Sequence, residues 1–293
     1  MRVTNNLIHK GVQSELQRSL AGIHDANLRV TTGLRIRKPS DDPAGAAEVM
    51  ATDRRIRALD QYRRNIDAAA ARVGAAESVL DQLTDILSRA REIGIAQGGD
   101  TASASTRQTA RAEVDQLLQT VIQLGNTRFG DAYLFGGAYA DRAPLADDGS
   151  TSMETPPVGD SPVALDQGQH VLTVHDAQSV FIDSGMIAAL QHLSGALAAN
   201  DPASIRDATA ELVTAFDATQ TRIGELGARA QRLESARANI DALDTAATLQ
   251  RSNIAEAEFE EAVTDLLNRQ AAYQAALMAT SRILNTTLTE YLR

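Results

Sequence analysis

The sequence contains no cysteine and no tryptophan, and only 3% of its 293 residues are aromatic. The absence of cysteine excludes disulfides and thiolate metal sites. So few aromatic residues leave few large side chains to anchor a globular core, and thin helical layers suit such a composition better. The chain is nevertheless long enough to bury a sizeable core and to form several parts.

Long apolar runs are also missing. No run approaches the length that a helix needs to cross a bilayer. The N-terminal sequence MRVTNNLIHKGVQSEL lacks the apolar segment that is typical of a cleavable signal peptide. By default these absences predict a soluble cytosolic protein, and they leave open export by a route that does not cleave a signal peptide.

Lysine is scarce, and charge is unevenly distributed. Lys10 and Lys38 are the only lysines, and the formal net charge is −10. Residues 1–64 carry 12 basic and 7 acidic side chains, whereas the rest of the chain carries 16 and 31. A nucleic-acid-binding protein needs a concentrated basic face. Here the arginines are interleaved with acids, so no nucleic-acid partner is expected.

The sequence shows no pattern typical of catalysis or cofactor binding. It lacks the HExxH motif, the EF-hand loop, the P-loop and the dinucleotide fingerprint, and it has no nucleophile elbow. The five histidines are scattered, and His170 and His175 would face opposite sides of a strand. We predict no catalytic, cofactor-binding or metal-binding residue, and we do not expect an enzyme.

What the sequence does contain is helical periodicity at both ends. Apolar residues recur at spacings of three and four from Met1 to about Leu124 and again from about Ile205 to Leu292, which predicts long amphipathic helices. Asn27 is a polar exception that could fix the register of the first seam. The terminal stripes are the candidate assembly interface, and they comprise Val12, Leu16, Leu20, Ile23, Leu277, Leu284, Leu288, Tyr291 and Leu292.

The middle of the chain differs in kind. Residues 137–183 are acidic and rich in turn-forming residues, with strand candidates at 163–165, 170–174 and 180–182. The predicted fold class is therefore mainly α, an elongated protein whose long terminal helices pair in a bundle, with a small β-containing outer domain.

The segment GLRIRKPSDDPAG separates the first two predicted helices. Gly33 can end the first helix, and Pro39 disfavours helix at Lys38. Asp41 and Asp42 are candidate caps for the second helix, and Pro43 fits its first turn. We interpret the two aspartates as caps rather than as metal ligands.

The same segment resembles a known family. TTGLRIRKPSDDPAGAAEVM is similar to the sequence that follows the first terminal helix in bacterial flagellins and flagellin-like axial proteins. The matching turn motif comprises Gly33, Leu34, Arg35, Ile36, Asp41, Asp42, Pro43 and Gly45. The run from Ser252 to Leu292 resembles the terminal helix of that family, beginning with Ile254, Ala257 and Phe259.

The resemblance implies three parts. Residues 1–40 with 255–293 would form a terminal helical assembly domain, partly disordered in the free subunit. Residues 41–137 with 184–254 would form a helical-bundle rod, and residues 138–183 a small acidic β-rich outer domain.

Three segments resemble the hook–filament junction members of the family (the third hook-associated proteins) more than its filament subunits: the opening MRVTNNLI, the exit from the helical region RFGDAYLFGG, and the ending LNTTLTEYLR. The resemblance thus implies a structural subunit that joins the hook, through the other junction protein, to the flagellin filament. Expected partners are further copies of the chain, that junction protein, flagellin and a cytosolic export chaperone, and the expected location is the extracellular flagellum. A filament flagellin and a cytosolic coiled-coil adaptor remain alternatives.

Overall fold

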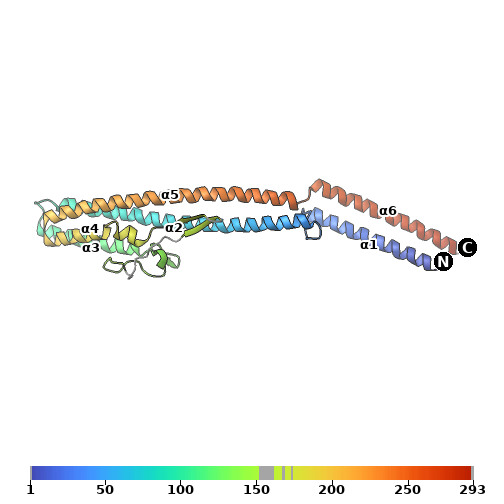
Figure 1. The fold of residues 1–293 in the computed structure, drawn as a ribbon, viewed down its shortest axis with the longest axis horizontal. Coiled ribbons are helices and arrows are strands. Elements are labelled where there is room, and N and C mark those ends of the chain that lie inside the picture. Colours follow the sequence, from blue (N-terminus) through green and yellow to red (C-terminus); the bar gives the residue numbers. More distant parts are fainter. Residues whose placement is uncertain (1, 152–161, 167–168, 173, 292–293) are drawn as a thin grey trace. The chain divides into compact units, whose positions relative to one another are not determined.

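The computed structural model describes residues 2–151, 162–166, 169–172 and 174–291. The fold is mainly α, as the periodicity predicts (Figure 1). Its helices are α1 (Arg2–Thr32), α2 (Pro43–Gln97), α3 (Ala104–Gly125), α4 (Met186–Ala199), α5 (Pro202–Ala255) and α6 (Phe259–Tyr291). None of the described helices combines the length and the apolar character that crossing a membrane requires.

The β structure in the described residues consists of two small antiparallel sheets. β1 (Arg128–Phe129) pairs with β2 (Ala132–Tyr133), and β3 (Pro162–Asp166) pairs with β4 (Gln169–Leu172). The register of the second pair shifts between Ala164 and Asp166, as at a β-bulge. This hairpin matches two of the three predicted strands.

The third predicted strand, over residues 180–182, is wrong. The segment forms η2 (Gln178–Ile182), a π-helix. A short 3₁₀ helix, η1 (Gly137–Tyr139), precedes the hairpin. Val174, Ala177, Phe181 and the intervening Val180 are buried at spacings of three and four, which is the periodicity of a helix and not of a strand. Phe181 packs edge-on against Phe135, with ring centroids 5.3 Å apart.

The contacts divide the chain into two units. One comprises Met1–Ala58 with Leu243–Arg293, and the other comprises Leu59–Ala242. The first unit therefore includes the start of α2 and the end of α5 together with α1 and α6. The predicted boundary at residue 40 lies instead in the break between α1 and α2, and the one at residue 255 lies at the end of α5, so the three-part division stays a prediction.

The unit of residues 59–242 holds the main apolar core. Leucine side chains from α2 and α4 are fully buried, and α3 packs on α4. α2 and α5 run antiparallel here, because Arg63 pairs with Asp241 at 2.9 Å and Asp67 pairs with Arg237 at 3.1 Å. The core leucines are Leu80, Leu83, Leu87, Leu190, Leu193 and Leu197.

In the unit of residues 1–58 and 243–293, α1 packs on α6. The start of α2 lies beside the end of α5, where Asp53 and Arg251 form an ion pair at 2.7 Å. Among the side chains that the structure describes in α1 and α6, the buried ones are small, Ala26 and Ala262. Small residues let two helices approach closely, but they bury little apolar area.

Candidate assembly surface

The paired terminal helices leave large apolar side chains uncovered. Leu20 on α1 is 48% exposed, and Leu277 and Met278 on α6 are 42% and 61% exposed. Val12, Leu16 and Ile23, predicted on the same stripe, are half-buried. A helix pair with so little covered area gains little stability from its own packing, so contacts with other chains would add to it.

The remaining predicted interface residues cannot be placed in the same way. Leu284, Leu288 and Tyr291 fall in the last turns of α6, where the backbone is described. Leu292 lies outside the described residues. The role of the terminal stripes in assembly therefore stays a prediction.

Asn27 does not occupy the seam of α1. Its side chain is exposed, and the neighbouring Ala26 is buried instead. The prediction that Asn27 fixes the register is wrong, because the helix turns its small alanine toward α6.

The motif after α1 forms a close contact with the break between α5 and α6. We call residues 33–36 and 255–257 the linker pair. The amides of Arg35 and Ile36 both donate to the carbonyl oxygen of Ala255, at 2.7 and 3.2 Å. In return, the Ala257 amide donates to the Gly33 carbonyl oxygen at 2.9 Å, and Leu34 forms a β-bridge with Glu256. The two helix breaks are thus fastened to each other by backbone hydrogen bonds.

Gly33 makes this geometry possible. Its φ of +68° lies in the left-handed region, which glycine adopts without strain. Its amide donates to the Arg29 carbonyl oxygen at 2.9 Å, so it ends α1 as predicted.

Arg35 and Ile36 strengthen the linker pair with their side chains. The Arg35 guanidinium donates to the carbonyl oxygen of Ile254 at 2.8 Å and to the Asp42 carboxylate at 3.3 Å. That carbonyl belongs to the end of α5, where helical partners run out. Ile36 is buried, with 8% of its surface exposed.

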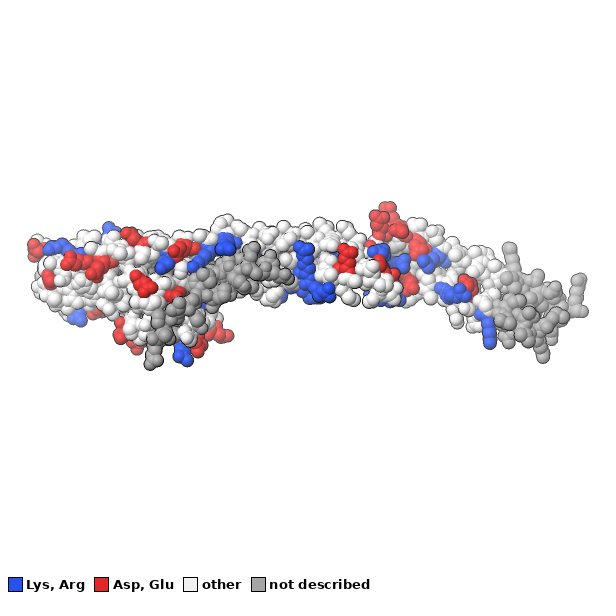
Figure 2. Space-filling view, in the orientation of Figure 1, with Lys and Arg blue, Asp and Glu red and all other residues white. Residues whose placement is uncertain are grey.

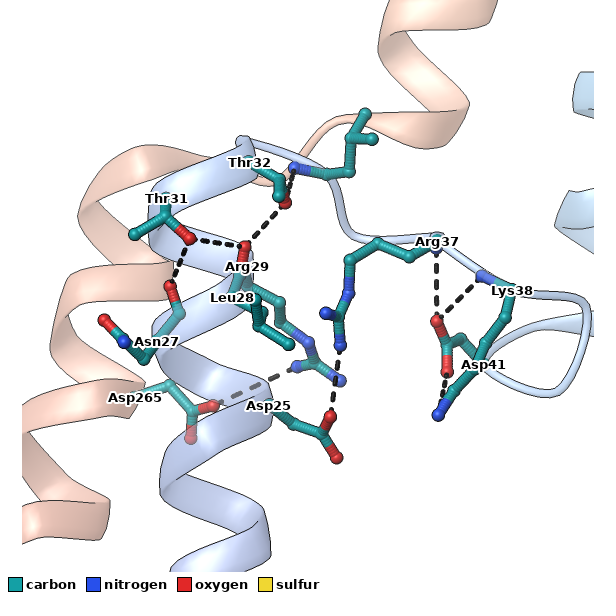
Figure 3. A network of polar contacts seen from close by, with 11 residues as sticks. Asp25, Asn27, Leu28, Arg29, Thr31, Thr32, Arg37, Lys38, Asp41 and Asp265 are labelled. Carbon is teal, nitrogen blue, oxygen red and sulfur yellow. Dashed lines mark hydrogen bonds and ion pairs between the residues drawn. The ribbon is translucent and has the colours of Figure 1, made fainter.

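Asp42 caps α2, as predicted, whereas Asp41 accepts from two amides that precede it and so holds the loop instead of capping the helix. Asp42 precedes α2, which begins at Pro43, and its Oδ1 accepts a hydrogen bond from the Gly45 amide at 3.0 Å. Asp41 Oδ2 accepts from the amides of Arg37 and Lys38, both at 3.1 Å (Figure 3). Among the described residues, no group of His, Asp or Glu is arranged to hold a metal ion.

These hydrogen bonds favour the ionised carboxylates. The Gly45 amide, helped by Arg35, lowers the pKa of Asp42 below its usual 3.8. Desolvation alone would raise the pKa of Asp41. The amides of Arg37 and Lys38 together with the charges of those side chains outweigh it and lower this pKa too.

Gly45 allows the turn to close on itself. A Cβ atom at this position would lie 2.5 Å from Ile36 Cδ1 and 2.6 Å from Asp42 Oδ2. The glycine is therefore required by close packing within the motif, and not by an unusual φ angle.

Ion pairs tie the motif to the terminal helices. Arg37 donates to Asp25 on α1 at 3.1 Å, and Arg29 on α1 reaches Asp265 on α6 at 4.0 Å (Figure 3). Asp265 also accepts from Arg269 on α6 at 2.9 Å. The first pair joins the motif to α1, and the second joins α1 to α6.

A cavity of about 280 Å³ opens beside the linker pair. Its lining combines three arginines with three acidic side chains and two alanines. The lining residues are Arg29, Arg35, Ala257, Glu258, Glu261, Ala262, Asp265 and Arg269.

The two helical ends match one family. Residues 3–140 match the model of the bacterial flagellin N-terminal helical region, and residues 207–292 match that of the C-terminal helical region. Together they span more than half of the chain. The chain belongs to the flagellin family. The motif that builds the linker pair lies inside the first of these regions, and the break that it contacts lies inside the second.

Individual flagellin-family relatives are distant. A flagellar filament 30.7 kDa core protein from Treponema maltophilum is 24% identical over 278 residues, which are 92% of this chain and 93% of the relative. The flagellar hook-associated protein 3 of Salmonella typhimurium is 26% identical over 146 residues. That match spans 50% of this chain and 46% of the relative, so it covers about half of each.

The fold has a counterpart of known structure. The flagellar junction protein FlgL from Legionella pneumophila superimposes with a TM-score of 0.58 at 16% identity, over 71% of this chain and 99% of that protein. At this identity the similarity shows a shared fold.

Sequence reasoning found the motif residues but missed what they contact. Nothing in the spacing of Arg35 or Ile36 points to Ala255, since the two segments are far apart in sequence. The available signal was that the helical pattern breaks after residue 32 and again before residue 259, in the two segments that meet.

Proposed function

We propose that this chain is a structural subunit of the bacterial flagellum that forms the junction between the hook and the flagellin filament. It would contact the hook through the other junction protein, and it would assemble with further copies of itself outside the cell. A cytosolic chaperone would hold it before export through the flagellar type III apparatus, without a cleaved signal peptide.

The observation that carries this proposal is the terminal helix pair. Among the side chains that the structure describes in α1 and α6, the buried ones are small, and leucine and methionine side chains are exposed. A protein that worked alone would gain nothing from exposing this apolar surface. A subunit that packs its terminal helices against neighbours would bury it, and the free energy gained would offset the entropy lost on ordering.

The junction position draws on the relatives. A protein named hook-associated protein 3 matches half of this chain. A protein named a flagellar junction protein has the same fold, and the superposition covers nearly all of that protein and 71% of this chain. Both names support a place at the end of the hook rather than along the filament.

One observation favours a second candidate function, that of a filament subunit. The Treponema maltophilum relative is a filament core protein, and its match spans nearly the whole of both chains. A filament subunit would use the same terminal helices but would be present in many more copies.

Electron microscopy of a strain that lacks this chain separates the two candidates. A junction subunit predicts hooks without filaments, with filament protein released into the medium. A second measurement is the amount of this chain in sheared flagella from the parent strain. A junction subunit should be scarce there relative to the major filament protein. Normal filaments in the deletion strain, or a chain as abundant as the filament protein, would contradict the junction proposal.

A further inference from the structure

Three arginines near the start of α2 form no ion pair with any described residue. Arg54, Arg55 and Arg57 are all exposed. The nearby Asp53 is already paired with Arg251, and Asp60 with Arg63. Arg54 and Arg57 lie three positions apart and so share one face of the helix, an arrangement of like charges that weakens a helix.

The opposite charge accumulates where α6 begins. Glu256, Glu258, Glu260 and Glu261 are exposed, and none of them forms an ion pair within the described part of the chain. Figure 2 shows acidic side chains gathered at the start of α6 and basic side chains over α2. The helix dipole accounts for acids in the first turn of α6, but Glu256 and Glu258 precede that turn.

The cavity beside the linker pair lies within this acidic region. Its three arginines already have carboxylate partners, since Arg35 pairs with Asp42, and Arg29 and Arg269 share Asp265. Two acidic residues of its lining, Glu258 and Glu261, form no ion pair with a described residue. At about 280 Å³, the cavity falls just below the usual size of small-molecule sites, about 300–1,000 Å³, and suits a single long side chain.

We propose that Arg54 and Arg57 of one copy of this chain dock against Glu258 and Glu261 of a second copy, with one guanidinium entering the cavity. The basic and acidic patches belong to the same unit of the fold, residues 1–58 with 243–293, but to different helices. A contact between two different patches is heterologous, and repeated contacts of this kind produce a ring or a helical series. The inference rests on the proposed function in one respect, that copies of the chain meet in an assembly, and it holds for a junction ring and for a filament alike.

Guanidinium and carboxylate groups form strong, directional pairs, and α2 presents its arginines as a rigid pair on one helix face. Complementary charge at such a contact would mainly fix its register and exclude wrong neighbours. The uncovered apolar stripes would supply most of the buried area.

Cysteine cross-linking tests the contact directly, because the chain has no cysteine of its own. A chain carrying Arg57→Cys and Glu261→Cys should form a ladder of covalent multimers when flagella containing it are oxidised. Each single-cysteine chain should give no ladder. The matched control pairs Arg91→Cys with Glu261→Cys, since Arg91 is also exposed and lies on α2, and it should stay uncross-linked. Double-cysteine chains that reach flagella in normal amounts but give no ladder would overturn the proposal.

Charge reversal gives a second, independent test. Reversal of Arg54 and Arg57 to Glu, or of Glu258 and Glu261 to Arg, should each lower the amount of chain in flagella about tenfold, because close pairs become repulsive. A chain with all four reversals should return to the original amount in flagella, because acidic side chains on α2 would then attract basic side chains at the start of α6. Arg91→Glu combined with Asp85→Arg is the control and should have no effect. A fourfold variant no better than the single-patch variants would overturn the proposal.

The failure of the proposed function would look different. In that case the unaltered chain would be absent from flagella. The inference is then tested with two purified variants in low salt, one with Arg54 and Arg57 changed to Glu and the other with Glu258 and Glu261 changed to Arg. Sedimentation should show that the mixture of the two variants associates, whereas neither variant associates alone. No association of the mixture would overturn it.

Discussion

Arg35 and Ile254 are 219 residues apart in the chain, yet the Arg35 guanidinium donates a hydrogen bond of 2.8 Å to the Ile254 carbonyl oxygen. The side chain is 48% exposed, so solvent screens part of the interaction. We expect Arg35→Ala to lower the free energy of unfolding by about 1 kcal/mol, and Arg35→Lys to recover only part of it. Urea denaturation measures the loss.

Amide hydrogen exchange shows whether the stability lost in Arg35→Ala comes from the linker pair. Exchange at Ala257, whose amide donates to Gly33, should accelerate in Arg35→Ala because the linker pair opens more often. Arg54→Ala is the control, since Arg54 forms no ion pair with a described residue. If Ala257 exchanges at the same rate in both variants, the arginine does not hold the linker pair closed.

A second prediction concerns the glycine of the turn motif. Gly45→Ala would place a Cβ atom 2.5 Å from Ile36 Cδ1, so the variant should lose about 1–2 kcal/mol of stability despite the better helix propensity of alanine. Ile36→Val removes the clashing Cδ1 and should rescue part of the loss in the double variant. Gly74→Ala, also in α2 but with nothing within 4 Å, should instead stabilise the protein by about 0.5–1 kcal/mol. Equal effects of the two glycine substitutions would contradict the packing argument.

The two aspartates of the motif should make the turn sensitive to pH. Both Asp41 and Asp42 have a pKa below the usual 3.8 in the folded chain, so their contribution to stability is complete above that value. This stabilisation should be lost as the pH falls through the pKa values that the two aspartates have in the folded chain. The Asp41→Asn/Asp42→Asn variant should therefore be less stable than the original chain at neutral pH, and the difference should shrink below about pH 4. Denaturation curves of both chains at several pH values measure this difference.

A further prediction concerns the buried Arg107 of α3, which binds the C-terminal end of α2. Arg107 is only 3% exposed, and it donates to the carbonyl oxygens of Gln97 and Gly99 and to Asn200 Oδ1. Arg107→Met would leave these acceptors without their donor and should cost about 3 kcal/mol. Arg91→Met, on an exposed face of α2, should change stability by less than about 0.5 kcal/mol. A comparable change in the two variants would show that the buried hydrogen bonds contribute little.

The long helices could be predicted from the sequence because their signals are local. The N-terminal periodic region was predicted to end at about Leu124, and α3 (Ala104–Gly125) ends one residue later, since apolar spacing and turn residues mark that end. The capping role of Asp42 was also readable, because an N-cap depends on residues only a few positions away.

What could not be predicted depends on distant residues. Phe181, in the π-helix of residues 178–182, is buried against Phe135, which lies more than 40 residues away in the sequence. Likewise the partners of Arg35 come from the other end of the chain, and spacing along one sequence carries no record of them. The family resemblance supplied the motif but not the contact that explains it.

The final prediction concerns the end of α6. Removing residues 278–293 shortens the helix that faces α1 but leaves residues 59–242 untouched, so the shortened chain should remain folded, with an unchanged thermal midpoint for that unit. It should nevertheless fail to support filament growth, because the removed segment is part of the predicted assembly stripe. Circular dichroism and swimming in soft agar are the two measurements. Leu277→Asp should mimic the loss of motility in milder form, since Leu277 is an exposed apolar residue of that stripe, whereas Gln274→Asp, at an exposed polar position one turn earlier, should have no effect. Normal swimming by the truncated chain would mean that assembly is decided elsewhere, and the contact between α2 and the start of α6 would then be the next surface to test.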